Sequence, residues 1–191
     1  MLQSFTMQSL LMLTPDDEAE EGSVCGRGTH RQYDHIGATC KNHIDICKIL
    51  LLYGADVSAS DEVNKTALYI ATYYGHERIV KLLIENGANI HAKLTEKQVT
   101  PLFWPVIKGF LKVCEMLILE GADVNAKDIH RQVPLHFAIE HRRTDIVKLL
   151  LATGASLNIK SLFSGNTPLE INFKRKDINM LKNVLSVKTE L

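Results

Sequence analysis

Apolar residues recur at helical spacing in four stretches of the chain, and each stretch runs into a glycine. The stretches occupy residues 48–59, 81–92, 115–126 and 148–159, and their glycines are Gly54, Gly87, Gly121 and Gly154. Each stretch predicts an apolar helix that ends in a left-handed turn, which glycine adopts at little cost because it has no Cβ. The glycines lie 33, 34 and 33 residues apart. A constant period of this length predicts stacked structural repeats.

A second pattern lies upstream of each glycine. Threonine or valine precedes proline or alanine and then leucine, at residues 66–68, 100–102, 133–135 and 167–169. Threonine offers a hydroxyl that can cap a helix, and proline suits the first helical position because its missing N–H needs no partner there. The pair Gly75-His76 then separates this helix from the next one. Each repeat is therefore expected to be a pair of helices.

Together these residues resemble the ankyrin repeat. The resemblance is carried by the Thr-Pro-Leu start, the Gly-His break, the Ile-Val and Leu-Leu pairs and the Gly-Ala-Asp turn, and it covers residues 28–187. It implies an all-α solenoid of about five repeats, at 28–60, 61–93, 94–127, 128–160 and 161–187. It also implies hairpin-like finger loops between neighbouring repeats.

The two ends of the predicted stack are irregular. In the first repeat, residues 33–38 match the helix-start pattern poorly, whereas the second helix matches it well. Terminal repeats have one neighbour and tolerate such substitution. In the last repeat, an apolar stripe at helical spacing predicts a C-terminal cap; it consists of Met180, Leu181, Val184 and Leu185.

The middle repeats also depart from the pattern. One extra residue falls within 94–99, in a finger, where length changes are tolerated. Pro105 stands inside the first helix of the third repeat and predicts a short or kinked helix. Its neighbour Trp104 is interpreted as a packed aromatic residue rather than a ligand platform. In the fourth repeat, Arg142-Arg143 replaces the Gly-His pair.

Residues 1–27 do not fit the repeat. The acidic run 16–21 favours a solvated tail, with a helix capped by Thr14 or a degenerate cap over the first repeat as alternatives. The apolar run 10–13 has no preceding basic residue and is far shorter than the ~20 residues that span a bilayer. Neither a signal peptide nor a membrane segment is expected.

Charge and cysteine content narrow the class of protein. Lysine plus arginine and aspartate plus glutamate number 22 each, so no general attraction to nucleic acid or anionic membrane is expected. The four cysteines are too few and too irregular for a disulfide framework. Cys47 and Cys114 are expected to be buried free thiols in a reducing compartment, either cytoplasm or nucleus.

The sequence carries no motif of a known catalytic class. It has no glycine-rich phosphate loop, no G-x-S-x-G elbow and no H-E-x-x-H helix, so neither enzyme activity nor a cofactor is expected. The resemblance assigns three histidines structural positions: His43, His76 and His136. The grouping His35, Cys40, His43 and Cys47 is spread over two helices and is not expected to bind metal. In the glycosylation triplet Asn64-Lys65-Thr66, Thr66 is better interpreted as a helix cap.

The resemblance implies that fingers and first helices line a concave surface that recognises a partner protein. By register, the positions on this surface are Thr29, His30, Cys40, Lys41, Glu62, Val63, Lys65, Tyr73, Tyr74, Thr95, Glu96, Ile107, Lys108, Ile129, His130, Gln132, Glu140, His141, Leu162, Phe163, Asn166, Lys174 and Arg175. Tyr73 and Tyr74 and the apolar fingertips are candidate anchors, because aromatic residues give large contact area at small entropic cost. The alternative is that they pack against an adjoining repeat. The basic runs 142–143 and 174–176 are interpreted as solvated faces, with an acidic partner segment as the alternative.

The sequence thus predicts a monomeric, non-catalytic adaptor, scaffold or inhibitor that binds another protein. The alternative is a segment of a larger ankyrin protein, such as a channel, toxin or injected effector, whose activity lies elsewhere. An unrecognised enzyme is the third and least favoured hypothesis.

Overall fold

A computed structural model describes residues 38, 39, 41–61 and 64–175 of the chain. The predicted N-terminal tail and the C-terminal apolar stripe lie outside these residues. The described helices are α2 (Ile44–Leu52), α3 (Ala67–Tyr74), α4 (Glu77–Glu85), α5 (Phe103–Lys108), α6 (Leu111–Leu119), α7 (Pro134–Glu140), α8 (Thr144–Ala152) and α9 (Pro168–Arg175).

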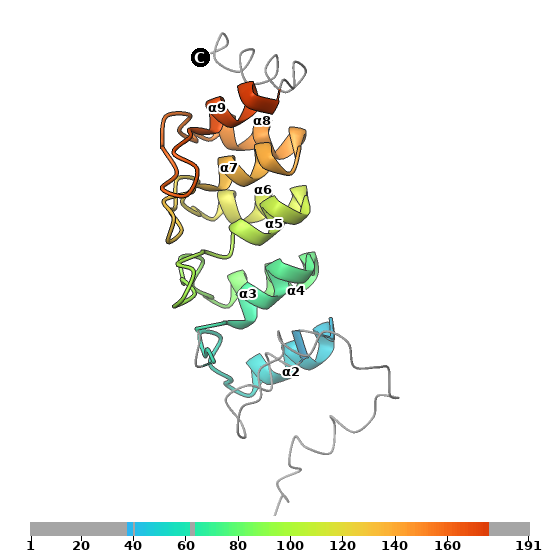
Figure 1. Cartoon of the computed structure of the whole chain (residues 1–191). Helices are drawn as coiled ribbons and strands as arrows, with labels where there is room; N and C mark the ends of the chain where they lie inside the picture. The colour runs from blue at the N-terminus through green and yellow to red at the C-terminus, as the bar shows by residue number, and fades with distance from the viewer. Residues whose placement is uncertain (1–37, 40, 62–63, 176–191) are drawn as a thin grey trace, which may run out of the picture.

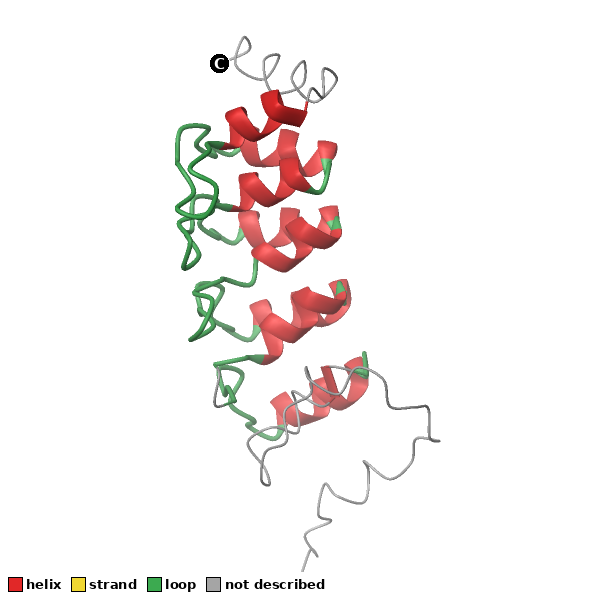
Figure 2. Cartoon of the chain, in the orientation of Figure 1, coloured by secondary structure: helices red, strands yellow, loops and turns green. Residues whose placement is uncertain are grey.

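The helices stack in two rows with the loops gathered along one side (Figures 1 and 2). α3 pairs with α4, α5 with α6 and α7 with α8 as helical hairpins. α3, α5, α7 and α9 pack in succession along one row, and α2, α4, α6 and α8 pack along the other. The predicted all-α solenoid is therefore confirmed.

The turn after each second helix has the same geometry. Gly54, Gly87, Gly121 and Gly154 have φ values of 78°, 84°, 92° and 92°. After α4, the Gly87 N–H donates to the Ile84 carbonyl and the Ala88 N–H to the Leu83 carbonyl, both at 2.9 Å. This Schellman pattern satisfies carbonyls that the helix end leaves open, and glycine supplies the left-handed conformation it needs.

Polar side chains then fold the chain away from each glycine turn, as the sequence predicted. The Oδ1 atoms of Asp56, Asn89 and Asp123 accept the backbone N–H two residues onward, at 2.8–2.9 Å. The hydroxyl of Ser156 does the same for Asn158 at 3.3 Å. These local bonds fix the path of the chain into each finger.

The predicted threonine caps hold at two helices and fail at a third. The Thr66 hydroxyl accepts the Tyr69 N–H at the start of α3. At α9, Thr167 and Glu170 form a reciprocal capping box at 2.7 and 3.2 Å. Thr100 does not cap a helix with its side chain, because α5 begins only at Phe103.

Pro105 explains both the late start and the short length of α5. If the helix began at Pro101, the missing N–H and the ring of Pro105 would break its first regular hydrogen bond. A start at Phe103 places Pro105 in the first turn, where no intrahelical donor is required. The helix therefore has 6 residues, against 8 in α3 and 7 in α7, as predicted.

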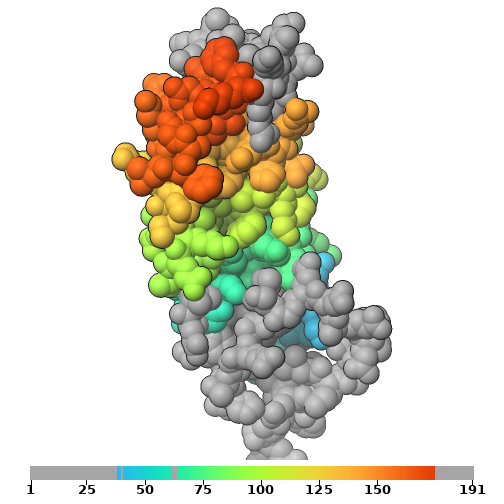
Figure 3. Space-filling view, in the orientation of Figure 1, coloured from blue at the N-terminus to red at the C-terminus, as the bar shows by residue number. Residues whose placement is uncertain are grey.

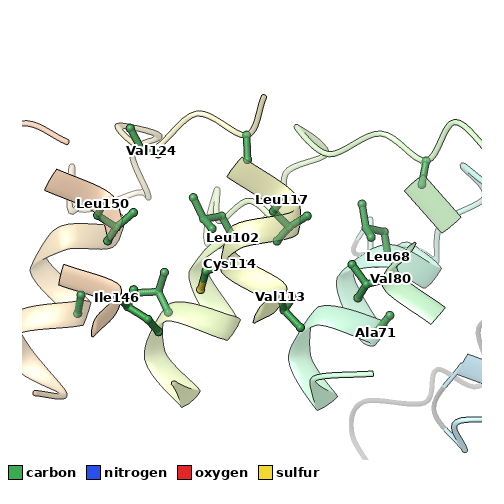
Figure 4. Packing of buried hydrophobic residues seen from close by; sticks show 14 of the residues in the cluster. Leu68, Ala71, Val80, Leu102, Val113, Cys114, Leu117, Val124, Ile146 and Leu150 are labelled. Carbon is green, nitrogen blue, oxygen red and sulfur yellow. The ribbon is translucent and has the colours of Figure 1, made fainter. Parts of the chain in front are cut away.

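The core runs through the stack as a continuous row of apolar side chains (Figure 4). Leu68, Leu83, Leu102, Leu117 and Leu150 are each at most 1% exposed. The two thiols are buried as predicted: those of Cys47 and Cys114 are 1% and 0% exposed. Burial raises the pKa of Cys114 to about 12, which keeps it protonated and unreactive.

Candidate functional site

Each finger is a tight loop closed by its own backbone. We name the loops by repeat: the second finger is 61–65, the third 94–99, the fourth 128–132 and the fifth 161–166. In the fourth finger the Asp128 N–H donates to the Gln132 carbonyl at 3.0 Å. The Asp128 Oδ1 in turn accepts the N–H groups of His130 and Gln132 at 2.9 and 2.7 Å. Ser161 plays the same part in the fifth finger through its hydroxyl.

Neighbouring fingers are joined to one another. The Ile129 N–H donates to the Lys97 carbonyl at 3.1 Å, and the Leu162 N–H donates to the His130 carbonyl at 2.8 Å. The Asn64 amide donates to the Lys93 carbonyl ahead of the third finger at 2.6 Å. These bonds fix the spacing between repeats and hold the third, fourth and fifth fingers as one edge.

The predicted insertion at 94–99 is confirmed, and the sequence analysis missed a second one. The third finger closes between Leu94 and Val99, whereas the fourth closes between Asp128 and Gln132, one residue shorter. The fifth finger, from Ser161 to Asn166, is also one residue longer than the fourth. Counting between glycines could not find it, because the last repeat has no turn glycine. The spacing of 34 residues from Val133 to Thr167 carries the signal.

Three apolar side chains project from the ends of the last two fingers. The exposed fractions of Ile129, Leu162 and Phe163 are 55%, 66% and 80%. The Phe163 ring lies 5.8 Å from the His130 ring, so the two fingertips touch. Figure 3 shows these fingers as orange and yellow atoms that bulge outward on the side where the loops lie in Figure 1.

Tyr73 and Tyr74, at the end of α3, are half-buried rather than freely exposed. The Lys108 ammonium lies 3.6 Å from the Tyr73 ring centroid, a cation–π contact with the next repeat. Trp104 packs edge-on against Tyr73 at 4.8 Å between ring centroids. Its indole N–H also donates to the Tyr69 hydroxyl. Trp104 is thus the packed aromatic residue that was predicted.

The structure places the other predicted surface residues at differing depths. Lys41, Thr95, Glu96, His130, Glu140, His141 and Lys174 are exposed, and Lys65, Ile107, Lys108, Gln132 and Asn166 are half-buried. Lys174 donates to the Asn166 side chain at 2.7 Å. Arg175 is the last residue of α9. Thr29, His30, Cys40, Glu62 and Val63 lie outside the described residues.

His136 has the structural role that was predicted. It is fully buried, its Nδ1 accepts the Val133 N–H at 3.1 Å, and its Nε2 lies 3.3 Å from the Asn166 carbonyl. With Nδ1 accepting, Nε2 carries the proton and donates, so the neutral ring links the fourth repeat to the fifth finger. Burial lowers the pKa of His136, which favours this neutral form.

The described residues hold no group of three or more His, Cys, Asp or Glu side chains placed to bind a metal ion. Of the grouping considered from the sequence, His35 and Cys40 lie outside the described part of the chain. Within it, the Cys47 thiol contacts the Thr39 hydroxyl at 3.7 Å. No helix in the described ranges combines the length and apolarity needed to cross a bilayer.

Comparison with known proteins gives two family matches. Residues 35–128 match the model described as "Ankyrin repeats (3 copies)", and residues 117–171 match "Ankyrin repeats (many copies)". The two matches overlap and together run from the first repeat into the fifth.

Curated relatives are similar over most of this chain. "Putative palmitoyltransferase ZDHHC13" of Danio rerio is 33% identical over 137 residues, which is 72% of this chain and 21% of the relative. Inversin of Homo sapiens is 32% identical over 75% of this chain and 13% of its own length. "Ankyrin repeat and KH domain-containing protein mask-1" of Caenorhabditis elegans is 30% identical over 90% of this chain and 5% of its own length. The chain therefore spans a small part of each of these relatives.

Proposed function

Because this chain belongs to the ankyrin repeat family, a family of protein-interaction modules, we propose that it is a non-catalytic adaptor, scaffold or inhibitor. Its partner is a protein that lies across the fingers and the first helices. We place the binding domain at residues 28–187, with residues 1–27 as a tail. The observation that carries the proposal is the row of backbone-bonded fingers with exposed apolar tips.

Rigidity supports this function. A loop that is already ordered loses little conformational entropy when a partner binds. The fourth and fifth fingers meet this condition through the bond between Leu162 and His130 and through the side chains of Asp128 and Ser161. Large apolar residues on an ordered support are the side chains that dominate interface energy. Ile129 and Phe163 match that description.

The proposal is tested by affinity capture from native lysate with the full chain as bait. The double variant Ile129→Ser, Phe163→Ser removes two exposed apolar fingertips. The matched control is Leu52→Ser, Leu119→Ser, because these leucines are 83% and 84% exposed and lie on second helices α2 and α6. We expect the fingertip variant to lose partners that the control retains, at equal melting temperature. Equal capture by both variants would place the interface elsewhere.

A second candidate is a segment of a larger ankyrin protein whose activity lies outside this chain. The observation in its favour is that the chain spans only 5–21% of the three relatives described above. Such repeats would hold a partner near another domain. Detection of the native protein in lysate by an antibody against this chain tests it, because a mass well above 21.4 kDa would favour the larger protein.

A further inference from the structure

A groove opens between the fourth and fifth fingers, and its lining is basic and partly apolar. Three cationic side chains line it, those of Lys127, Arg131 and Lys160. The apolar side chains of Ile159 and Leu162 lie between them in the sequence and line the same groove. We call this site the fifth-finger groove. No aspartate or glutamate is among the residues that line it.

The three cations are available for an external anion. All three are exposed, and none forms an ion pair with another described residue; the ion pairs in that part of the chain are Lys48–Asp45 and Lys81–Glu85. The nearby carboxylate of Asp128 already accepts two backbone N–H groups. Glu170 likewise accepts the Thr167 N–H at 2.7 Å, and the charge of Lys160 contributes only a minor part to the low pKa of Glu170. Like charges this close repel one another, and a bound anion relieves that repulsion.

Arg131 occupies a backbone position that favours other residues. Its φ is 58°, in the left-handed region, and the equivalent turn residue of the fifth finger is Gly165 with φ 67°. An arginine there is less stable than glycine by about 1 kcal/mol. Its side chain forms no hydrogen bond with the described residues that would offset this cost. Folding therefore does not explain why an arginine stands at this position.

We propose that the fifth-finger groove binds an extended acidic segment of a partner protein. Aspartate and glutamate side chains of the segment pair with Lys127, Arg131 and Lys160, and one aliphatic side chain packs on Ile159 and Leu162. This inference rests on the proposed function and names the chemistry of its partner. It places the acidic partner segment at residues other than the basic runs 142–143 and 174–176.

An acidic peptide fits the groove better than a nucleic acid. Nucleic-acid affinity comes from many phosphate contacts, on the order of 6–10 in specific complexes. The groove offers three cations on a chain of zero formal net charge. Its apolar side chains offer nothing to a phosphate backbone but suit a leucine or isoleucine between acidic residues.

The probe is a short fluorescein-labelled peptide of alternating aspartate and glutamate with one central leucine. A second peptide replaces every acid by its amide, and a short single-stranded DNA reports nucleic-acid binding. Fluorescence anisotropy with the full chain measures the Kd of each probe at low and at physiological salt. We expect the acidic peptide to bind at least about tenfold more tightly than the amide peptide, which corresponds to about 1.4 kcal/mol.

Variants separate the groove from general charge. The groove variant is Lys127→Gln, Arg131→Gly, Lys160→Gln, and we expect it to weaken the acidic peptide roughly tenfold or more. The control, Lys41→Gln, Lys112→Gln, Lys148→Gln, removes the same charge from exposed lysines elsewhere. Arg131→Gly alone should weaken the peptide while raising the melting temperature, because it relieves the left-handed arginine. A variant that is more stable and binds less cannot be explained by misfolding.

Three results would overturn the inference. Equal weakening by the groove and control variants would show diffuse electrostatics, and equal affinity for the amide peptide would show that charge is not recognised. Tighter, groove-dependent binding of the DNA would identify a nucleic-acid site instead. None of these results affects the fingertip test, because Ile129 and Phe163 do not line the groove. The two proposals can therefore fail separately.

Discussion

Replacing Gly75 with alanine is expected to destabilise the stack far more than the same change at Gly87. The φ values of the two glycines are 75° and 84°, so the backbone strain of an alanine is similar at both, about 1 kcal/mol. The space around them differs. A Cβ on Gly75 would lie 2.7–2.9 Å from three ring atoms of Phe110, whereas a Cβ on Gly87 would meet no atom within 4 Å.

The Phe110 ring has limited room to move. Phe110 is the residue that precedes α6, and its half-buried side chain packs against the core. Forcing extra volume into such a contact typically costs about 1–3 kcal/mol. The Gly75→Ala variant should therefore lose about 2–4 kcal/mol of unfolding free energy, and Gly87→Ala about 1 kcal/mol.

Urea unfolding followed by far-ultraviolet circular dichroism measures both losses. Combining Gly75→Ala with Phe110→Leu tests the cause, because a smaller side chain removes the clash. The double variant should be more stable than the sum of the single losses by about 1 kcal/mol. If alanine at Gly75 and at Gly87 proved equally destabilising, or if the double variant were simply additive, the contact with Phe110 would not be the reason.

Three further predictions use the same unfolding assay. Leu83→Ala should cost about 2–5 kcal/mol because Leu83 is 1% exposed, and a loss below about 1 would contradict the assigned core. Tyr73→Ala should cost about 1–2 kcal/mol by removing contacts with Lys108 and Trp104; an unchanged midpoint would return Tyr73 to the set of free anchors. Burial lowers the pKa of His136, so its contribution to stability is full above about pH 6.5 and is lost as the pH falls below that value. The His136→Asn variant should be less stable at neutral pH and show a smaller loss between about pH 7 and pH 5; an unchanged pH dependence would show that His136 is not the titrating group.

The sequence predicted those features of the fold that depend on local backbone geometry. Gly54, Gly87, Gly121 and Gly154 could be read as helix ends because a left-handed turn needs glycine wherever it occurs. The polar residues that follow them bond to an N–H two residues onward, so no distant neighbour is involved. The repetition of both signals at one period then predicted the stack.

Features that depend on contacts between repeats were harder to predict. Tyr73 and Tyr74 looked like exposed anchors, but Tyr73 is covered by Trp104 and Lys108, which are more than 30 residues further along the chain. The late start of α5 came from Pro105 overriding the capping chemistry of Thr100, a conflict that the sequence pattern alone did not resolve. The fifth-finger groove was not predicted either, since its cations come from separate repeats.

The turn position shared by the fingers shows which residues folding leaves undetermined. Asn64, Gln98, Arg131 and Gly165 have φ values of 64°, 55°, 58° and 67°, so four different side chains stand on one backbone conformation. Folding alone would favour glycine at all of them, by about 1 kcal/mol each over a bulkier residue. A stack can carry such local losses because each repeat is stabilised mainly by the apolar interface with its neighbours. The side chain at this position is therefore free to be set by what the finger binds. On this argument Arg131, which makes no bond that the fold uses, is more informative about the partner than any buried residue of its repeat.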